Sequence, residues 1–324
     1  MIGWLLRRAV QAAATFAVAI LLLFVLMRVT PGDPLARLAG ERQVSAEELA
    51  HLRARFGLDQ PVAAQLRAFL GGVARGDLGV SMEHYPERVT ALLAARLPAT
   101  LLLGAAVLFL NFSLGVWLGV RQAVRRGTRL DRWLTRAALA GYATPSFWLG
   151  LVLVAFVSLR WHLLPAAQMT DPLLPAGAPP GVRALDVLRH LILPAVTLSV
   201  TSIAVTMRHQ RAALLGTFRQ DYVMAARLRG LTERRVLWGH AWRNTLVPML
   251  TLLGLWLPIL VSGSVFVEAV FNWPGLGSLA ADAIAARDYP VLLGTAMLAS
   301  GAVVAAGLLA DLGYALVDPR VRPA

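Results

Sequence analysis

Two residue types are missing from this chain of 324 residues. The absence of cysteine excludes disulfides, thiolate metal sites and cysteine nucleophiles. Lysine is also absent, because all 31 basic residues are arginine. The Walker A loop of P-loop ATPases needs a lysine at the phosphates, so the chain cannot hydrolyse ATP by that route. An active pump built on this chain would therefore need an external source of ATP energy.

Charged residues are scarce in general. They make up 15% of the chain against 57% hydrophobic residues, and the mean hydropathy is +0.63. These values lie well outside the range of ordinary soluble domains and predict a protein embedded in a lipid bilayer. The net charge of +13 would suggest nucleic acid in a soluble chain. Here the arginines flank apolar runs and no motif for base or phosphodiester recognition is present, so we expect no nucleic-acid partner.

The sequence offers no constellation for catalysis or metal binding. Four histidines adjoin the ends of apolar runs, but none has metal-ligand spacing, and the motif H-E-x-x-H is absent. A G-x-S-x-G nucleophile elbow is absent as well. We therefore predict no catalytic residue, no metal site and no cofactor in this chain, and we expect a transport subunit rather than an enzyme.

Six apolar runs predict an all-α polytopic membrane protein. Runs of about 20 residues cross roughly 30 Å of hydrocarbon as a helix. The first run is too long for a signal peptide and no A-x-A site follows it, so we interpret it as a span. Arginines flank the short loops and both ends, which predicts that both termini are cytoplasmic. The expected spans are 9–27, 97–120, 137–159, 191–207, 244–267 and 289–310.

The polar stretch 30–96 after the first span predicts a folded helical segment outside the membrane. Ser45 and Glu48 form a capping box that opens a helix, and Gly57 is placed to end it. Pro61 opens a second helix, which is followed by a glycine-rich turn at 75–79. A segment of this length can be translocated despite its arginines, so we expect it on the outer side.

The stretch 221–248 is the one long charged segment between two apolar runs. Asp221 can cap a short helix that carries the small pair Ala225 and Ala226, and Gly230 can end it in the left-handed conformation. Thr232 can cap a second helix with Glu233 in its first turn. The pattern predicts a helix, a glycine elbow and a helix that another protein could approach closely. A basic amphipathic pair on the anionic membrane surface explains the pattern equally well.

Several predicted spans are interrupted, which makes them candidates for hinges or for the lining of a transport path. The residues concerned are Pro145, Pro194, Pro258, Gly263 and Glu268. Each proline or glycine taken singly is explained by kinking for packing. Glu268 adjoins the outer end of an apolar span, where an ionisable group is costly unless it is paired or faces water. It could contact substrate or a docked protein, or it could hold the turn at 273–277 or pair with Arg287.

The chain resembles the inner-membrane permeases of binding-protein-dependent ABC importers, in the branch for dipeptides, oligopeptides, nickel and glutathione. The stretch 220–248 is similar to the EAA loop of that family. The resemblance covers nearly the whole chain through eight further motifs: TPGDP (30–34), FGLDQP (56–61), RGDLG (75–79), RLPATLLL (96–103), RHLILPAVTL (189–198), VEAVFNWPGLG (267–277), RDYPV (287–291) and DPRVR (318–322).

This resemblance implies a single permease domain over 1–324 with a type I importer fold. It implies that 208–245 is the segment that couples to the ATPase. The coupling residues that it implies are Asp221, Tyr222, Ala225, Ala226, Arg227, Gly230, Leu231 and Glu233. Met224 departs from the pattern, because the broad family often has glutamate there; His240 and Arg243 likewise replace an apolar residue and a proline.

The resemblance also implies the partners and the location. We expect a second homologous permease subunit in a heterodimer, two ATPase subunits that bind ATP and Mg, and an extracytoplasmic solute-binding protein, all at a bacterial inner membrane. Di- or oligopeptides are the implied cargo, with nickel or glutathione as the alternative within the family. An ion-coupled secondary transporter would need buried acids within the spans, and the six apolar cores contain none.

Overall fold

The computed structural model describes residues 2–29, 45–175, 177–258 and 264–317, and every named element in these ranges is a helix. The helices are α1 (Ile2–Val29), α3 (Ala46–Arg55), α4 (Val62–Ala74), α5 (Val89–Val124), α6 (Arg129–Ala143), α7 (Ser146–Leu153), the π-helix η1 (Val154–Arg160), α8 (Pro180–Thr217), α9 (Asp221–Leu228), α10 (Glu233–Arg235), the π-helix η2 (Val236–Ala241), α11 (Trp242–Trp256), α13 (Val265–Val270), α14 (Leu276–Ala286) and α15 (Tyr289–Val317).

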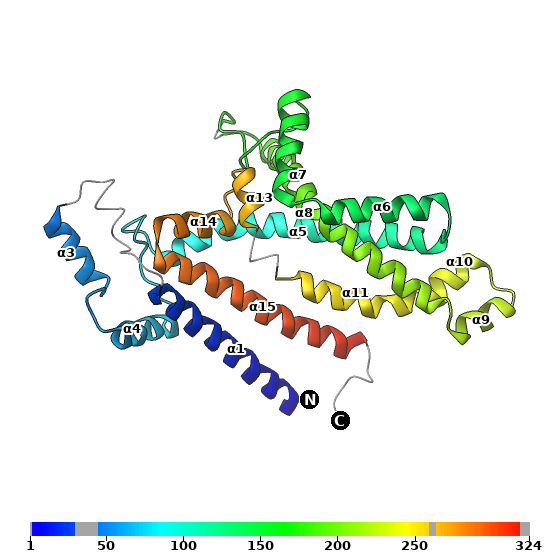
Figure 1. Ribbon diagram of the computed structural model, residues 1–324, viewed down its shortest axis with the longest axis horizontal. Coiled ribbons are helices and arrows are strands. Elements are labelled where there is room, and N and C mark those ends of the chain that lie inside the picture. The colour runs from blue at the N-terminus through cyan, green and yellow to red at the C-terminus, as the bar shows by residue number, and fades with distance from the viewer. Residues whose placement is uncertain (1, 30–44, 176, 259–263, 318–324) are drawn as a thin grey trace.

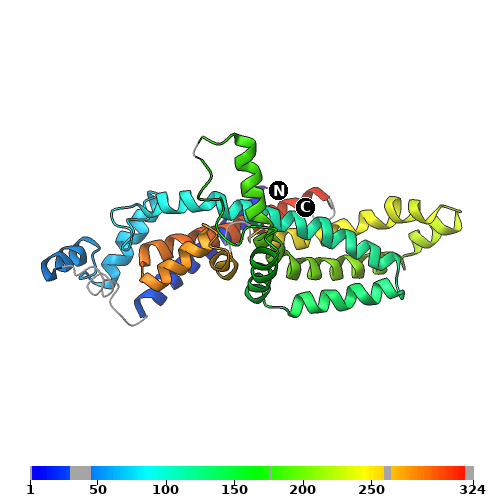
Figure 2. The same ribbon diagram turned by 90° about the horizontal axis from the view of Figure 1, so that it is seen from above.

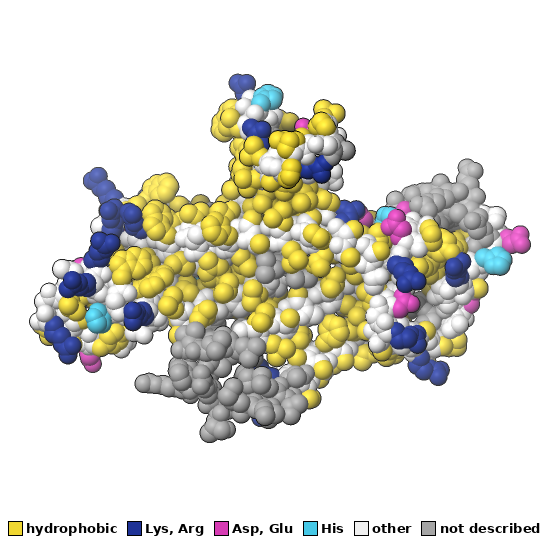
Figure 3. All heavy atoms as spheres, turned by 180° about the vertical axis from the view of Figure 1, so that it is seen from behind, with side chains coloured by type: hydrophobic (Ala, Val, Ile, Leu, Met, Phe, Trp, Pro, Cys, Tyr) yellow, Lys and Arg dark blue, Asp and Glu magenta, His cyan; other side chains and the backbone are white. Residues whose placement is uncertain are grey.

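The molecule is elongated (Figures 1 and 2). Helices α9 and α10 lie at one end, while α3, α4 and α14 lie toward the other (Figure 1). Long helices run between these ends, among them α5 and α8, and α1 packs beside α15. Figure 3 shows hydrophobic side chains over the middle of the molecule and arginines gathered toward both ends. This distribution suits a protein whose middle lies in a bilayer.

Within the described residues, four helices are long and apolar enough to cross a membrane, in agreement with four of the six expected spans. They are α1, α5, α8 and α15. Helix α8 continues past the apolar run 191–207 as a polar helix to Thr217. The expected fifth span is divided between α11 and α13, and 259–263 between them lie outside the described residues.

The expected third span, 137–159, is not one continuous helix. Helix α6 ends at Ala143, and the chain bends by 100° before it continues as α7 and η1. The cause is local, because a residue before proline is disfavoured in the helical conformation. Thr144 indeed adopts extended dihedral angles (φ −81°, ψ 121°) immediately before Pro145. Helix α6 and the segment α7–η1 add one span to the four long helices only if they are counted together as a single bent span.

The expected helical segment after the first span is present where it is described. Helix α3 begins directly after Ser45, and Gly57 follows it with a left-handed φ of +62°. Helix α4 follows Pro61 and packs onto α1, with the rings of Phe24 and Phe69 stacked 5.7 Å apart. The structure does not describe 30–44. The described part is thus anchored to the bundle by aromatic packing.

Helices α5 and α8 form the most extensive helix pair, and glycines make their close approach possible. A Cβ on Gly119 would lie 2.7 Å from the carbonyl oxygen of Met207 and 2.7 Å from Cβ of Gln210. A Cβ on Gly115, one turn away, would lie 2.9 Å from Cβ of Thr206. Small residues at helical spacing are the usual means of close helix contact in membranes.

Replacing Gly119 with alanine should therefore destabilise the protein although alanine favours helix. The added methyl group meets backbone at 2.7 Å, and overpacking of this kind costs about 1–3 kcal/mol. We expect a lower apparent Tm for the purified protein in detergent. The matched control is Gly307→Ala in α15, where nothing lies within 4 Å of the new Cβ. Equal Tm values for the two variants would contradict the close α5–α8 contact.

Candidate functional site

The segment between α8 and α11 forms the expected helix, elbow and second helical turn. Helix α9 starts at Asp221, but Gln220 occupies the N-cap position, so Asp221 lies in the first turn and is not the cap. Thr232 does occupy the N-cap position of α10, yet its side chain makes no capping hydrogen bond. The second helix differs from expectation, because α10 is a three-residue turn that continues through η2 into α11.

Gly230 forms the elbow between α9 and α10. Its φ is +76°, in the left-handed region that glycine adopts without steric cost, as the sequence predicted. The Gly230 N–H donates to the carbonyl of Arg227 (2.9 Å), which closes the end of the helix. The elbow is therefore a defined turn with its own hydrogen bonding.

A small apolar core holds the two arms of the elbow together. Val223 and Ala226 of α9 are buried against Val236 of η2, with Phe218 and Leu231 packed around them. The two alanines that the sequence predicted as a small pair thus lie in different environments. Ala226 lies inside this core, whereas Ala225 is exposed on the outer surface. The arms can move only as one body while this core is intact.

The outer surface of α9 carries apolar side chains that sequence reasoning did not single out. Leu228 is 83% exposed and Met224 is 51% exposed. Their spacing of four residues places them on one helix face beside Ala225. That spacing was the signal that could have identified them. Tyr222 is 42% exposed on the same short helix.

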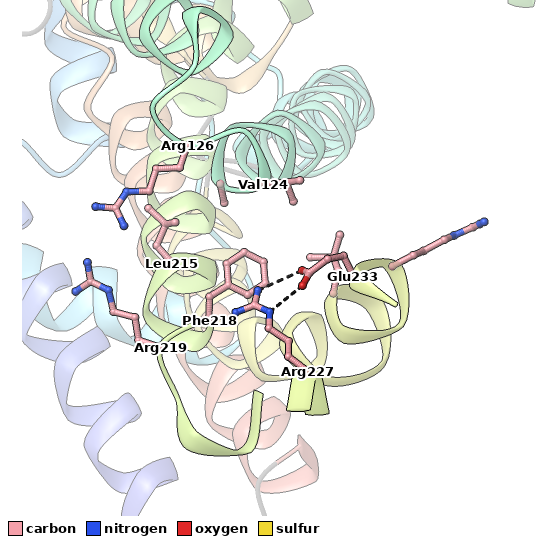
Figure 4. Close-up of a pocket in the computed structure, with 10 residues that line it drawn as sticks. Val124, Arg126, Leu215, Phe218, Arg219, Arg227 and Glu233 are labelled. Atoms are coloured by element: carbon pink, nitrogen blue, oxygen red, sulfur yellow. Dashed lines mark hydrogen bonds and ion pairs between the residues drawn. The ribbon is translucent and has the colours of Figure 1, made fainter. Parts of the chain in front are cut away.

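Polar contacts fix the segment internally and to the bundle. Arg227 crosses the elbow to Glu233 with two hydrogen bonds of 2.9 and 3.2 Å, and its guanidinium lies over the ring of Phe218 (Figure 4). The amide of Asn244 in α11 donates to the Tyr222 hydroxyl. All the predicted coupling residues therefore lie on this one compact element.

Two further contacts connect the segment's flanking helices to the rest of the bundle. Gln210 of α8 donates to Thr245 of α11 at 3.1 Å, in a buried position. Arg211 pairs with Asp131 of α6 at 3.0 and 2.9 Å. These two hydrogen bonds form a bidentate, charge-assisted contact between the guanidinium of Arg211 and the carboxylate of Asp131. Side-chain contacts thus connect α8, which leads into the elbow, to both α6 and α11.

The candidate hinge and path residues occupy different environments. Pro145 is exposed and stands at the bend between α6 and α7, whereas Pro194 is buried within an unbroken α8. Pro258 is half-buried in the turn after α11. Gly263 lies outside the described residues. Their role as hinges or in lining a path stays a prediction.

Glu268 is fully buried and holds the tryptophan-containing turn, one of the roles that the sequence suggested. Its carboxylate accepts hydrogen bonds from the backbone N–H of Ser278 (2.8 Å) and of Ser264 (3.3 Å). The same turn is fixed by Trp273, whose indole donates to the carbonyl of Ala99 (2.9 Å). The N–H of Leu276 donates to the Thr100 hydroxyl at 2.7 Å. These contacts give the carboxylate a structural function between α13 and α14.

Within the described ranges, no group of three or more histidine, cysteine, aspartate or glutamate side chains is placed to hold a metal ion. The side chains gathered at the elbow are arginines, apolar residues and one paired glutamate. Such a surface can bind another macromolecule, but it has no nucleophile with a partner base.

Comparison with known proteins gives matches along the whole chain. Residues 111–323 match the family model described as binding-protein-dependent transport system inner membrane component. Residues 1–104 match the model of the N-terminal part of such membrane components. The dipeptide transport system permease protein DppB of Escherichia coli is 36% identical over 99% of both chains. The oligopeptide transport system permease protein AppB of Bacillus subtilis is 34% identical, over 99% of this chain and all of the relative.

A solved structure has a similar fold. It is the MetNI methionine ABC transporter in inward-facing conformations, with a TM-score of 0.53 over 71% of this chain and 97% of that chain. The sequence identity is 16%, so the similarity concerns the fold alone.

Proposed function

Because the chain belongs to the family of binding-protein-dependent transport system inner membrane components, it is a multi-pass permease subunit of an ABC importer, and we propose that α9 and α10 are where its ATPase docks. The observation that carries the proposal is the elbow itself. It combines a rigid internal core with an outward surface of Ala225, Met224 and Leu228. An exposed apolar patch with a polar surround is typical of a protein interface.

The rigidity of the elbow matters because the ATPase can drive transport only if its interaction free energy differs between two conformational states of the permease. ATP-driven closure of the ATPase can shift the permease only if the two proteins interact differently in the inward-facing and outward-facing states. A flexible loop would absorb the displacement. The elbow is braced by the Arg227–Glu233 pair and joined to α11 by the hydrogen bond from Asn244 to Tyr222, and α11 is in turn joined to α8 by the hydrogen bond from Gln210 to Thr245. It can therefore transmit movement to the spans.

The proposed topology has six spans, with the α9–α10 end in the cytoplasm. The bent pair α6 and α7–η1 serves as the third span, and α11 with α13 serves as the fifth. Helix α1 begins and α15 ends on the same side of the bundle, which agrees with two cytoplasmic termini (Figure 1). The segment with α3 and α4 then lies on the outer side, where a solute-binding protein docks.

The proposed cargo is a di- or oligopeptide. The relatives named above are permeases of dipeptide and oligopeptide systems, which favours peptides over nickel or glutathione. An ion-coupled secondary transporter is not favoured by the family. The proposed complex contains this chain, a second homologous permease and two ATPase subunits that bind ATP and Mg. This chain then contributes the path and the coupling surface.

The docking proposal is tested by placing a bulky side chain at Ala225. Ala225 is exposed, so tryptophan is tolerated by the fold but keeps another protein surface away. We expect about tenfold less ATPase subunit to co-purify with the Ala225→Trp variant from gently solubilised membranes. The matched control is Ala63→Trp on α4, at the opposite end of the molecule (Figure 1). Undiminished co-purification with Ala225→Trp would contradict docking at this surface.

A further inference from the structure

A cavity of about 430 Å³ lies beside the elbow, on the side that faces the bundle. It is formed where three parts of the chain meet: the end of α5, the end of α8 and the helices α9 and α10 (Figure 4). Its lining includes Val124, Arg126, Leu215, Arg219, Arg227 and Glu233. The proposed ATPase contact does not use this cavity, because that contact lies on the outward face of α9.

The cavity carries an excess of positive charge. Four arginines and one glutamate line it, and the glutamate is already paired with Arg227. Arg126 and Arg219 have no ion pair among the described residues, and both extend past Leu215 on the same side (Figure 4). Two guanidinium groups that line one cavity favour the binding of an anion there, because it offsets their mutual repulsion. Arginine also suits phosphate, because its planar fork can donate two parallel hydrogen bonds.

The rest of the lining is apolar and continues into the membrane-spanning surface. Val124 is 54% exposed at the end of α5, and Leu215 and Leu237 lie against the same small core as Val120. The neighbouring turn of α5 places Arg121 over the ring of Trp117, 4.7 Å from its centroid. Exposed tryptophan with arginine is typical of the level at which a span leaves the hydrocarbon.

We propose that this cavity binds an anionic phospholipid of the leaflet on the elbow's side of the membrane. Its phosphate lies between Arg126 and Arg219, and its acyl chains follow Val124 and Leu215 along α5 and α8. Basic pockets between spans on the cytoplasmic side are suited to such head groups. The apolar surface that continues into the bilayer favours a lipid over a carboxylate of the ATPase, which would bring no chains to cover it. The inference uses the proposed function only in assigning this end to the cytoplasm.

A lipid held there would join the end of α5 to the turn between α8 and α9. These two parts of the chain must keep their spacing for the elbow to move with α8. An anionic lipid binds better to the conformations in which the cavity is formed and so favours them. Because it restricts the spacing in this way, it would strengthen coupling.

The test uses the whole complex, purified in detergent and titrated with phosphatidylglycerol or phosphatidylcholine while bound lipid is counted by native mass spectrometry. We expect preferential retention of phosphatidylglycerol, and a roughly tenfold or greater loss of its apparent affinity in Arg126→Gln/Arg219→Gln, since hydrogen bonds to charged groups are lost. The matched control is Arg132→Gln/Arg136→Gln, which removes two exposed arginines of α6 that do not line the cavity. It should bind phosphatidylglycerol like the unaltered complex.

Three results would overturn the proposal. Equal losses in both double variants would mean that only overall charge attracts the lipid. Displacement of the lipid by excess inorganic phosphate would indicate a site for the free anion. Loss of the ATPase subunit from Arg126→Gln/Arg219→Gln with unchanged lipid binding would assign the cavity to acidic residues of that subunit. ATPase co-purification is measured on the same samples, so failure of the docking proposal is seen separately from failure of lipid binding.

Discussion

Leu228→Asp is expected to abolish peptide-stimulated ATP hydrolysis and uptake by the reconstituted complex. Leu228 is 83% exposed in this chain, so aspartate costs little in the permease itself. In the proposed complex the same position is covered by the ATPase, where an unpaired carboxylate is costly. The loss of several kcal/mol corresponds to a roughly hundredfold or greater weakening of the contact. The measurement is ATP hydrolysis with and without peptide-loaded binding protein in proteoliposomes.

The control for this substitution is Leu228→Met. Methionine preserves an apolar side chain of similar volume, and such exchanges usually cost less than about 1.5 kcal/mol even in a packed site. Coupling should therefore persist with Leu228→Met. Full coupling with Leu228→Asp, in a complex that contains normal amounts of ATPase, would mean that α9 does not form the contact.

The second large effect is expected for Gly275→Ala, at the turn that Glu268 holds. A Cβ at position 275 would lie 2.6 Å from the Glu268 carboxyl carbon and 2.6 Å from the Thr100 hydroxyl, and both side chains are buried. The carboxylate would have to leave the N–H groups of Ser278 and Ser264. A buried polar group that loses its hydrogen-bond partners costs about 1–3 kcal/mol, and overpacking by the added methyl group costs about 1–3 kcal/mol more. We expect a strongly reduced apparent Tm and less protein in the membrane.

Gly177→Ala provides the comparison for this variant. Gly177 lies in the segment before α8, and nothing stands within 4 Å of a Cβ placed there. Its apparent Tm should be unchanged. If Gly275→Ala were as stable as Gly177→Ala, the buried contacts of Glu268 would not contribute to stability in the way that its geometry implies.

Local signals in the sequence predicted the turns well. Gly57 and Gly230 were identified because a helix ended where glycine could adopt positive φ, and both do so. Residue pairs that are far apart in sequence could not be predicted in this way. The bond from Trp273 to the carbonyl of Ala99 spans 174 residues, and no periodicity encodes it. The turn at 273–277 was therefore recognisable as a turn, while its partner across the bundle was not.

Hydropathy could not show where a local conformational rule interrupts a helix. The run 137–159 carries no charge, so it suggested one continuous span, but Thr144 before Pro145 breaks the helix within it. Hydropathy also hides polar side chains that face inward. The amide of Asn111 in α5 is buried without a hydrogen-bond partner among the described residues. The sequence does not show whether a polar residue within an apolar run faces the protein interior or the lipid. Only the packing of the helices shows this.

The unbroken course of α8 has a mechanical consequence. From Pro194 to Thr217 it is about 35 Å long at roughly 1.5 Å per residue, and it ends just before the elbow. A rod of that length acts as a lever: a tilt of about 10° at one end moves the other by roughly 6 Å. A displacement of about 6 Å at the ATPase surface would thus move side chains at the midpoint of this stretch by roughly 3 Å, with no rearrangement inside the helix.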